Sequence, residues 1–164
     1  MCIFCGTKQF STIIDFFGKV GCGTVRGIVW EKTNPSPMNG EFVYLSGVEF
    51  AVWFKKSRAT FNGFCKNTVF RYPSIESNIH PTQKPVGLFQ ELITDNTKEG
   101  DIVFDPCMGS GTTAVACVRS DRNYIGFELI KNYYDLCTKR VEAEKALKER
   151  DRFFYNLVNT DDCN

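Results

Sequence analysis

The order of hydrophobic and polar positions along the chain predicts strands that alternate with helices. Short apolar runs bounded by glycine or polar residues indicate strands, and apolar residues three and four positions apart indicate helices. Strands are expected at 2–5, 27–30, 48–54, 102–104, 124–127 and 153–158. Helices are expected at 10–17, 85–93, 114–118 and 132–152. This alternation is typical of an α/β fold with a doubly wound sheet.

A glycine-rich turn in the segment 105–113 joins one expected strand to the next helix. Gly109 and Gly111 allow a tight turn and the close approach of a ligand, and Ser110 or Thr112 is expected to cap the helix. Strand, glycine turn and helix form the nucleotide-binding unit of doubly wound sheets. The glycine spacing also fits a dinucleotide fingerprint, which keeps an NAD-dependent oxidoreductase open as an interpretation.

Two acidic residues argue for a cationic ligand at this turn. Asp105 ends the strand, where its carboxylate would repel a pyrophosphate but attract the sulfonium and ammonium groups of S-adenosylmethionine. Glu128 ends the following strand, where a carboxylate can accept hydrogen bonds from both ribose hydroxyls. A purely structural interpretation, in which the glycines only make a turn and Asp105 caps it, stays open at this point.

Composition and cysteine usage narrow the class of protein. The 164 residues suffice for one domain with a core. The chain contains neither an apolar run near the ~20 residues of a membrane span nor the pattern of a signal peptide, so we expect a cytoplasmic protein. Of eight cysteines only Cys2 and Cys5 form a C-x-x-C pair, and there is one histidine, so we expect reduced thiols and no metal site.

Net positive charge is concentrated in the first half of the chain, because acidic residues are fewer there. Residues 1–75 hold nine Lys/Arg and four Asp/Glu, whereas residues 76–164 hold eleven and fifteen. Either the first half faces a polyanion and the second a cationic cofactor, or the difference in charge is chance scatter. Basic and aromatic residues interleave over 57–79, which is either a short DNA-recognition segment or a loop packed on the sheet. The candidates for contact with DNA are Lys32, Lys55, Lys56, Arg58, Lys66 and Arg71.

Several segments together resemble the amino-group DNA methyltransferases, which modify adenine or cytosine. The segment 105–113 resembles the cofactor loop of that family, and 80–85 (His-Pro-Thr-Gln-Lys-Pro) resembles the segment that holds the methionine end of the cofactor. Residues 124–128 resemble the family's second strand, and 30–35 and 49–53 resemble strands toward the other edge of its sheet. The order of these segments resembles a permuted class in which the catalytic motif precedes the cofactor loop.

The resemblance implies an enzyme that transfers a methyl group from S-adenosylmethionine to an exocyclic amine in DNA. Asp105 would then hold the cofactor's ammonium group, Glu128 its ribose hydroxyls, and Thr82 with Lys84 its carboxylate. The full set of implied cofactor-binding residues is Asp105, Pro106, Gly109, Ser110, Gly111, Thr112, Thr113, Glu128, Thr82 and Lys84.

The family's catalytic motif, which is Asp, Asn or Ser followed by Pro-Pro and an aromatic residue, has no match in this sequence. The chain contains no Pro-Pro dipeptide, and residues 34–37 (Asn-Pro-Ser-Pro) are followed by Met38 where an aromatic residue is needed. In the family, the strand with this motif lies between the strands matching 102–104 and 2–5. We therefore expect a Rossmann-like methyltransferase sheet that is incomplete at its central catalytic strand.

Two consequences follow for function. We expect no catalytic residue within this chain, and a separate chain or segment that supplies the motif. The alternative is a catalytically inactive remnant of the family that only binds the cofactor or DNA.

Overall fold

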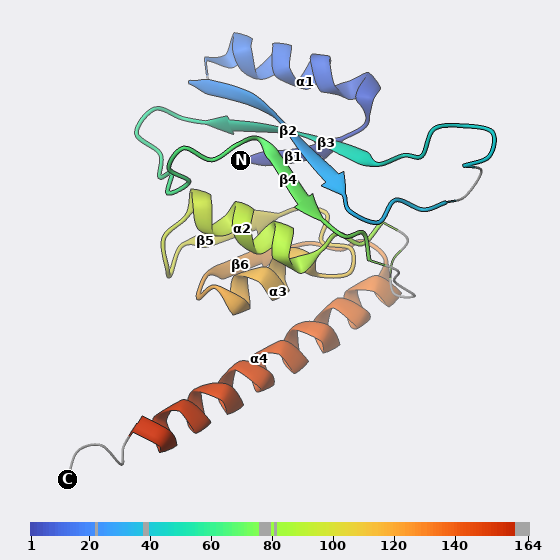
Figure 1. Cartoon of the computed structure of the whole chain (residues 1–164). Coiled ribbons are helices and arrows are strands. Elements are labelled where there is room, and N and C mark those ends of the chain that lie inside the picture. Colours follow the sequence, from blue (N-terminus) through green and yellow to red (C-terminus); the bar gives the residue numbers. More distant parts are fainter. Residues whose placement is uncertain (22, 38–39, 76–79, 81, 160–164) are drawn as a thin grey trace. The chain divides into compact units, whose positions relative to one another are not determined.

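The computed structural model describes residues 1–21, 23–37, 40–75, 80 and 82–159, and the chain divides into two compact units. The first unit comprises Met1–Glu76 with Asp95–Thr97, and the second comprises Ser77–Thr94 with Lys98–Asn164. Each unit has a sheet and at least one helix of its own (Figure 1).

The first unit is built on a four-stranded sheet. In spatial order its strands are β1 (Cys2–Cys5), β3 (Val48–Lys55), β2 (Thr24–Lys32) and β4 (Val69–Tyr72). Strand β3 is antiparallel to both of its neighbours, whereas β2 and β4 are parallel. Trp30 and Val52 are almost completely buried in the core of this sheet.

Helix α1 (Thr7–Val20) lies along this four-stranded sheet (Figure 1). The ring of Phe17 stacks on Phe54 of β3, with the ring centroids 3.6 Å apart. Gly27 of β2 leaves room for Phe10, because a Cβ atom at position 27 would lie 2.6 Å from the Cζ of that ring. The missing side chain therefore lets the helix approach the sheet closely.

The second unit contains a two-stranded parallel sheet and helices around it. Its elements are α2 (Val86–Asn96, which ends among the residues grouped with the first unit), β5 (Ile102–Asp105), α3 (Thr112–Arg119), β6 (Asn123–Gly126) and α4 (Lys131–Asn159). Ile102 is opposite Asn123 and Asp105 is opposite Gly126, so the carboxyl ends of both strands meet at one edge.

Helix α3 forms the centre of the core of the second unit. All of its residues except Arg119 are small or β-branched, and Ala114, Val115 and Cys117 are at most 1% exposed. The other buried members of the core are Val86, Ile93, Met108, Ala116, Cys137 and Val141. Because these residues come from α2, α3, α4 and the turn after β5, the core fixes that turn against three helices.

Three features differ from the sequence-based expectations or refine them. Residues 153–158 were expected to form an edge strand, but they continue α4, and neither glycine nor proline interrupts this helix. The irregular segment 57–79 contains β4. Within the described ranges the strands form two sheets that share no strand pairing, so β1 and β5 do not pair with each other.

In the part of the chain that the structure describes, no helix is long and apolar enough to cross a membrane. Within the same ranges, no three His, Cys, Asp or Glu side chains come together in a way that could hold a metal ion.

Candidate functional site

Asp105 closes the turn between β5 and α3. One of its carboxylate oxygens accepts a hydrogen bond from the backbone N–H of Cys107 at 3.0 Å, and the other accepts one from the hydroxyl of Thr113. Pro106 lies exposed between these partners. The acid expected at the ligand therefore also fixes the shape of the loop.

Glu128 holds the same loop from the neighbouring strand. Its Oε2 accepts a hydrogen bond from the backbone N–H of Gly109 at 2.8 Å, and its Oε1 accepts one from the N–H of Ile130, just before α4, at 2.8 Å. The N–H of Met108 also donates to the carbonyl of Phe127 at 2.9 Å. The structure thus places Asp105 and Glu128 around one glycine loop, at the edge where both parallel strands end.

The two glycines of the loop have left-handed backbone angles, with φ of 52° at Gly109 and 78° at Gly111. A Cβ atom at position 111 would lie 2.5 Å from the Sγ of Cys137 in α4. A Cβ atom at position 109 would lie 3.4 Å from the Nε2 of His80. Packing against protein atoms therefore already requires a glycine at position 111, in addition to any approach of a ligand.

The hydroxyl residues of the loop are buried and take part in internal hydrogen bonds. Ser110, Thr112 and Thr113 are 4%, 6% and 5% exposed. The hydroxyl of Thr112 donates to the backbone carbonyl of Lys84 at 3.2 Å. The residue at the N-cap of α3 is Gly111, without a side-chain cap, so the expected cap by Ser110 or Thr112 is wrong. These hydroxyls instead form hydrogen bonds with other segments of the second unit.

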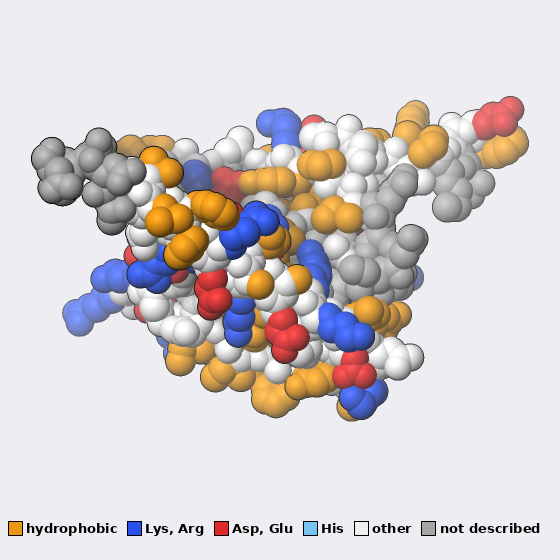
Figure 2. Space-filling view, turned by 90° about the horizontal axis from the view of Figure 1, so that it is seen from below, with side chains coloured by type: hydrophobic (Ala, Val, Ile, Leu, Met, Phe, Trp, Pro, Cys, Tyr) orange, Lys and Arg blue, Asp and Glu red, His pale blue; other side chains and the backbone are white. Residues whose placement is uncertain are grey.

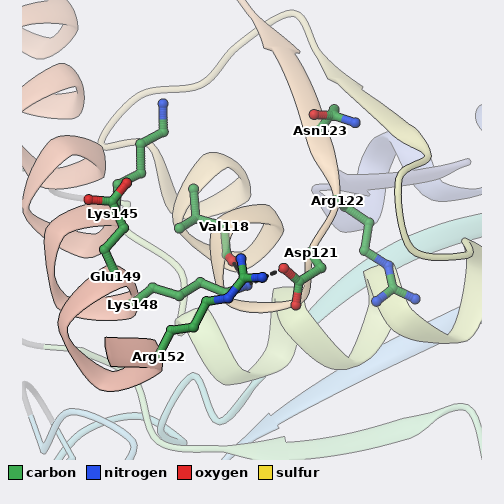
Figure 3. Close-up of a pocket in the computed structure, with 8 residues that line it drawn as sticks. All are labelled: Val118, Asp121, Arg122, Asn123, Lys145, Lys148, Glu149 and Arg152. Carbon is green, nitrogen blue, oxygen red and sulfur yellow. Dashed lines mark hydrogen bonds and ion pairs between the residues drawn. The ribbon is translucent and has the colours of Figure 1, made fainter. Parts of the chain in front are cut away.

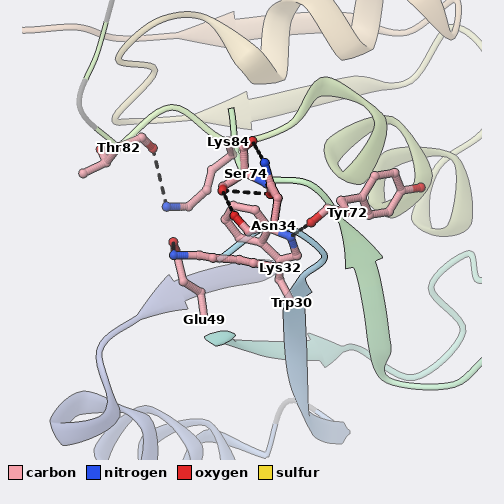
Figure 4. A network of polar contacts seen from close by, with 8 residues as sticks. All are labelled: Trp30, Lys32, Asn34, Glu49, Tyr72, Ser74, Thr82 and Lys84. Carbon is pink, nitrogen blue, oxygen red and sulfur yellow. Dashed lines mark hydrogen bonds and ion pairs between the residues drawn. The ribbon is translucent and has the colours of Figure 1, made fainter. Parts of the chain in front are cut away.

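The segment that precedes α2 lies against the loop through its histidine. The N–H of Thr82 donates to the Nδ1 of His80 at 3.2 Å, and the Thr82 hydroxyl is 3.1 Å from the same nitrogen. The Nζ of Lys84 lies 3.5 Å from the Thr82 carbonyl (Figure 4). Thr82 and Lys84 thus belong to the same unit as Asp105 and Glu128, next to the residue that contacts Gly109.

Two residues to which the sequence analysis gave no role, and one that it did not notice, also belong to this site. The ring of His80 packs against Tyr133 of α4, with centroids 4.5 Å apart. Arg140, two turns further along α4, donates from Nη1 to the carbonyl of Ser110 at 3.0 Å. His80 and Tyr133 stand inside or beside the quoted motifs, but Arg140 had no sequence signal, because an arginine on a charged helix is normally a solvated residue.

Burial shifts the protonation of several groups around the loop. Desolvation lowers the pKa of the half-buried guanidinium of Arg140 and raises the pKa of the Cys137 thiol. Burial in α3 raises the pKa of Cys117 to about 11. Cys107, by contrast, is exposed within the loop itself. The helices α3 and α4 thus contribute a half-buried charge and two protonated thiols, while the loop itself contains one accessible thiol.

A cavity of about 330 Å³ lies at the opposite end of the second unit, where β6 begins (Figure 3). It is lined by Val118, Asp121, Arg122, Asn123, Lys145, Lys148, Glu149 and Arg152. Lys148 forms an ion pair with Asp121 at 2.7 Å inside it. Because β5 and β6 are parallel, this cavity and the glycine loop lie at opposite ends of the strands, so it is separate from the candidate site.

One face of the β5–β6 sheet exposes large hydrophobic side chains. Ile102, Phe104, Ile125 and Phe127 are between 49% and 63% exposed. The rings of Phe104 and Phe127 form an edge-to-face pair with centroids 6.0 Å apart. Hydrophobic side chains are visible at the surface in Figure 2. Parallel sheets are normally buried on both faces, whereas the described residues of the second unit leave this face exposed.

The six candidate DNA-binding residues all lie in the first unit, in two different settings. Lys32, Lys66 and Arg71 form ion pairs with Glu49, Asp95 and Glu31 at 3.1, 2.6 and 3.1 Å. Lys55, Lys56 and Arg58 follow one another at the end of β3, where the Nζ of Lys55 donates to the carbonyl of Ala59 at 3.1 Å.

Asn34, in the segment compared with the catalytic motif, has a structural contact in the first unit. Its side-chain amide donates to the carbonyl of Ser74 at 3.1 Å and accepts from the N–H of Ser74 at 2.6 Å (Figure 4). Nearby, the indole N–H of Trp30 donates to the carbonyl of Tyr72 at 2.9 Å. Asn34 thus joins the segment after β2 to the segment after β4.

Comparison with known proteins gives matches to DNA methyltransferases. The model of a DNA methylase family, which covers N6 and N4 methyltransferases, matches residues 63–139. Type II methyltransferase M2.DpnII of Streptococcus pneumoniae is 33% identical over 146 residues, and the alignment covers 76% of this chain and 53% of the relative. M2.MboI of Moraxella bovis is 33% identical, with 69% and 48% covered. The chain thus spans about half the length of these relatives.

Solved structures show the same relationship. The crystal structure of the M1.HpyAVI–SAM complex superimposes with a TM-score of 0.74 at 39% identity, covering 86% of this chain and 73% of the other. The cytosine-N4-specific PvuII DNA methyltransferase superimposes with a TM-score of 0.68 at 18% identity, covering 86% and 62%, which shows the fold alone. The fold is thus the Rossmann-like fold of these enzymes.

Proposed function

Because this chain belongs to the DNA methylase family of N6 and N4 methyltransferases, we propose that it is the cofactor-binding part of an S-adenosylmethionine-dependent DNA methyltransferase. The single observation that supports this most is the position of Asp105 and Glu128, which bind one glycine loop from the ends of two adjacent strands. Two carboxylates at one loop favour a positively charged methyl donor over a dinucleotide.

The contacts of the two acids leave them able to bind a ligand. Each oxygen of an ionised carboxylate can accept about two hydrogen bonds. The structure describes one bond to each oxygen of Asp105 and of Glu128. We propose that Asp105 receives the ammonium group and Glu128 the ribose hydroxyls, while Thr82 and Lys84 meet the carboxylate. Ser110, Thr112 and Thr113 shape the loop from inside. Pro106 is exposed, Gly109 is partly buried and Gly111 is buried, and we propose that the backbone of these three residues lies along the cofactor.

The bound cofactor would supply a methyl group activated by its sulfonium for transfer to an exocyclic amine of adenine or cytosine. The amine is held in place for this step by the Pro-Pro-aromatic motif of the family, after the base has left the helix stack. We propose that a polypeptide segment outside these 164 residues supplies the motif. The absence of any Pro-Pro dipeptide and the exposed hydrophobic side chains on one face of the β5–β6 sheet support this.

We propose DNA contacts in the first unit, at the end of β3. Lys55, Lys56 and Arg58 provide adjacent positive charges there. Lys32, Lys66 and Arg71 would have to share or exchange their carboxylate partners to reach a phosphate. The segment 57–79 would then contribute to recognition through the loops on either side of β4.

Calorimetry with S-adenosylmethionine tests the cofactor proposal. We expect binding by the full chain, a loss of affinity of tenfold or more in both Asp105→Asn and Glu128→Gln, and no binding of NAD. Asp135→Asn is a matched control, because Asp135 is an acid on α4 whose described partner is Lys131 rather than the loop. A well-folded sample that binds no S-adenosylmethionine would refute the proposal.

Methyl transfer distinguishes an enzyme from an inactive remnant. Labelled S-adenosylmethionine and mixed DNA are incubated with the chain alone and with the chain co-expressed with the part of M2.DpnII that it does not match. Transfer only in the second sample supports a supplied motif. Binding of cofactor or DNA with no transfer in either sample would favour the remnant.

A further inference from the structure

Arg140 connects three segments of the candidate cofactor site in the second unit. Its Nη1 lies 3.0 Å from the carbonyl oxygen of Ser110, 3.3 Å from the Ser110 hydroxyl and 3.4 Å from the hydroxyl of Thr112. Thr112 in turn donates to the carbonyl of Lys84 at 3.2 Å. A continuous path of hydrogen bonds therefore runs from α4 through the loop to the segment before α2.

The direction of these hydrogen bonds gives Arg140 a specific role. A guanidinium can only donate, whereas a hydroxyl has one hydrogen and can accept two bonds. When Arg140 donates to Thr112, the single hydrogen of Thr112 is left to point at the carbonyl of Lys84. The donor at one end of the path thus sets the orientation of the hydroxyl in the middle.

Arg140 also fixes the peptide between the two glycines of the loop. The Ser110 carbonyl that it binds belongs to the same peptide group as the N–H of Gly111, which donates to the carbonyl of Met108 at 2.8 Å. Both polar atoms of this peptide group are therefore held. Since Gly109 and Gly111 have left-handed angles that the chain leaves easily, holding the peptide between them restricts the loop as a whole.

The acceptors around Arg140 show that its contact is more than a surface ion pair. The three described acceptors of its Nη1 are neutral oxygens, and all three belong to Ser110 and Thr112, which are at most 6% exposed. Burial of the Arg140 charge is costly and is only partly compensated by the electrostatic attraction of Glu144, so hydrogen bonds in a fixed geometry help to offset that cost. The neighbouring arginine Arg119 instead forms a two-point ion pair with Glu144, at 2.7 and 2.9 Å, between α3 and α4.

We propose that Arg140 is a positioning residue for the cofactor, which sets the shape of the loop 109–112 and its distance from the Lys84 segment without touching the ligand. This inference rests on the proposed function for its ligand. It predicts that cofactor affinity depends on Arg140 more steeply than stability does.

The experiment compares Arg140→Met, the milder Arg140→Lys, and Arg119→Met, which removes a charged contact between α3 and α4 that does not reach the loop. We expect Arg140→Met to weaken S-adenosylmethionine binding tenfold or more in calorimetry well below the melting temperature. Arg140→Lys should lose less affinity than Arg140→Met, and the affinity of Arg119→Met should lie within twofold of that of the unchanged chain. The double variant Arg140→Met with Thr112→Val should lose less binding free energy than the sum of the two single variants, since both substitutions break the same path of hydrogen bonds.

Hydrogen exchange of the unliganded chain provides a readout that does not need the cofactor. We expect Arg140→Met to speed exchange in the peptides that cover Lys84 and 109–112, and Arg119→Met to leave both unchanged. Equal melting shifts in Arg140→Met and Arg119→Met, with unchanged exchange at both segments, would overturn the inference. If the unchanged chain binds no cofactor, the proposed function fails, while the exchange data still decide whether Arg140 positions the loop.

Discussion

Met108 occupies the space beside Gly126, so that a Cβ atom at position 126 would lie 1.6 Å from the Met108 sulfur. Met108 is 8% exposed, and its backbone N–H is bound to the carbonyl of Phe127. The start of the glycine loop is therefore locked onto the end of β6 by both its backbone and its side chain.

Gly126→Ala should lower the free energy of unfolding by about 1–3 kcal/mol, because the Met108 side chain is too confined to move away without strain. Urea unfolding measures this change. Gly18→Ala is the control, since a Cβ atom there meets no atom within 4 Å and Gly18 lies in α1, where alanine is favoured. The double variant Met108→Ala with Gly126→Ala should lose less free energy of unfolding than the sum of the losses in the two single variants. If the two losses simply add, the contact between residues 108 and 126 is contradicted.

Gly111→Ala should be more destabilising than Gly100→Ala, although the two glycines have nearly the same backbone angle. Their φ values are 78° and 80°, so both substitutions incur a left-handed penalty of about 1–2 kcal/mol. A Cβ atom at position 100 meets open space, whereas one at 111 would lie 2.5 Å from the Sγ of Cys137. We expect about 1–3 kcal/mol of additional loss at position 111 in chemical unfolding. Equal losses would show that α4 does not press on the loop.

The stability of the chain should fall as pH rises from about 9 to 11. Burial raises the pKa of Cys117 from the ordinary value of 9.0 to about 11, so in this window the unfolded chain has released a proton that the folded chain retains. The stabilising contribution is therefore complete below pH 9 and is lost as pH passes through the higher value. Thermal melting of the unchanged chain and of Cys117→Ala checks this, and the variant should show a shallower decline. If the melting temperature falls equally steeply with pH in the unchanged chain and in Cys117→Ala, groups other than Cys117 cause the loss of stability.

Cys107 should be alkylated rapidly by a thiol reagent near pH 8, and S-adenosylmethionine should slow this reaction severalfold. Cys107 is exposed in the loop between the two acids, while Cys117 is fully buried and should react only after unfolding. Mass spectrometry of labelled peptides gives both rates. Cys65, which is exposed in the first unit, is an internal control that should react equally with and without the cofactor. Protection of neither thiol by a cofactor that calorimetry shows to bind would place the ligand elsewhere.

Lys56→Ala with Arg58→Ala should reduce the salt dependence of DNA binding as well as the affinity. Each phosphate contact contributes about 0.9 to the slope of log K against log salt for duplex DNA, so losing two contacts lowers the slope by about 2. Fluorescence anisotropy at several salt concentrations measures it. Lys8→Ala with Lys19→Ala removes the same charge from α1 and should leave the slope unchanged. Equal effects of the two pairs would mean that only net charge matters.

The local parts of this molecule were predictable from sequence, because they depend on neighbouring residues. The turn at Gly109 and Gly111 and the acid at Glu128 follow from spacing along the chain, and the family relationship agrees with them. Arg140 was not predictable, since its partners lie about thirty residues away and its helix reads as a charged surface. Residues 153–158 were assigned the wrong element, because a short aromatic run fits a strand or a helix equally and the tertiary context decides.

The exposed hydrophobic face of the β5–β6 sheet should also affect the stability of this polypeptide against degradation inside a cell. It exposes a hydrophobic surface of the kind that chaperones and quality-control proteases recognise, formed by Ile102, Phe104, Ile125 and Phe127. Its steady-state abundance should then rise when the segment proposed to complete the sheet is produced alongside it, so the supply of that segment would set the cellular level of this chain.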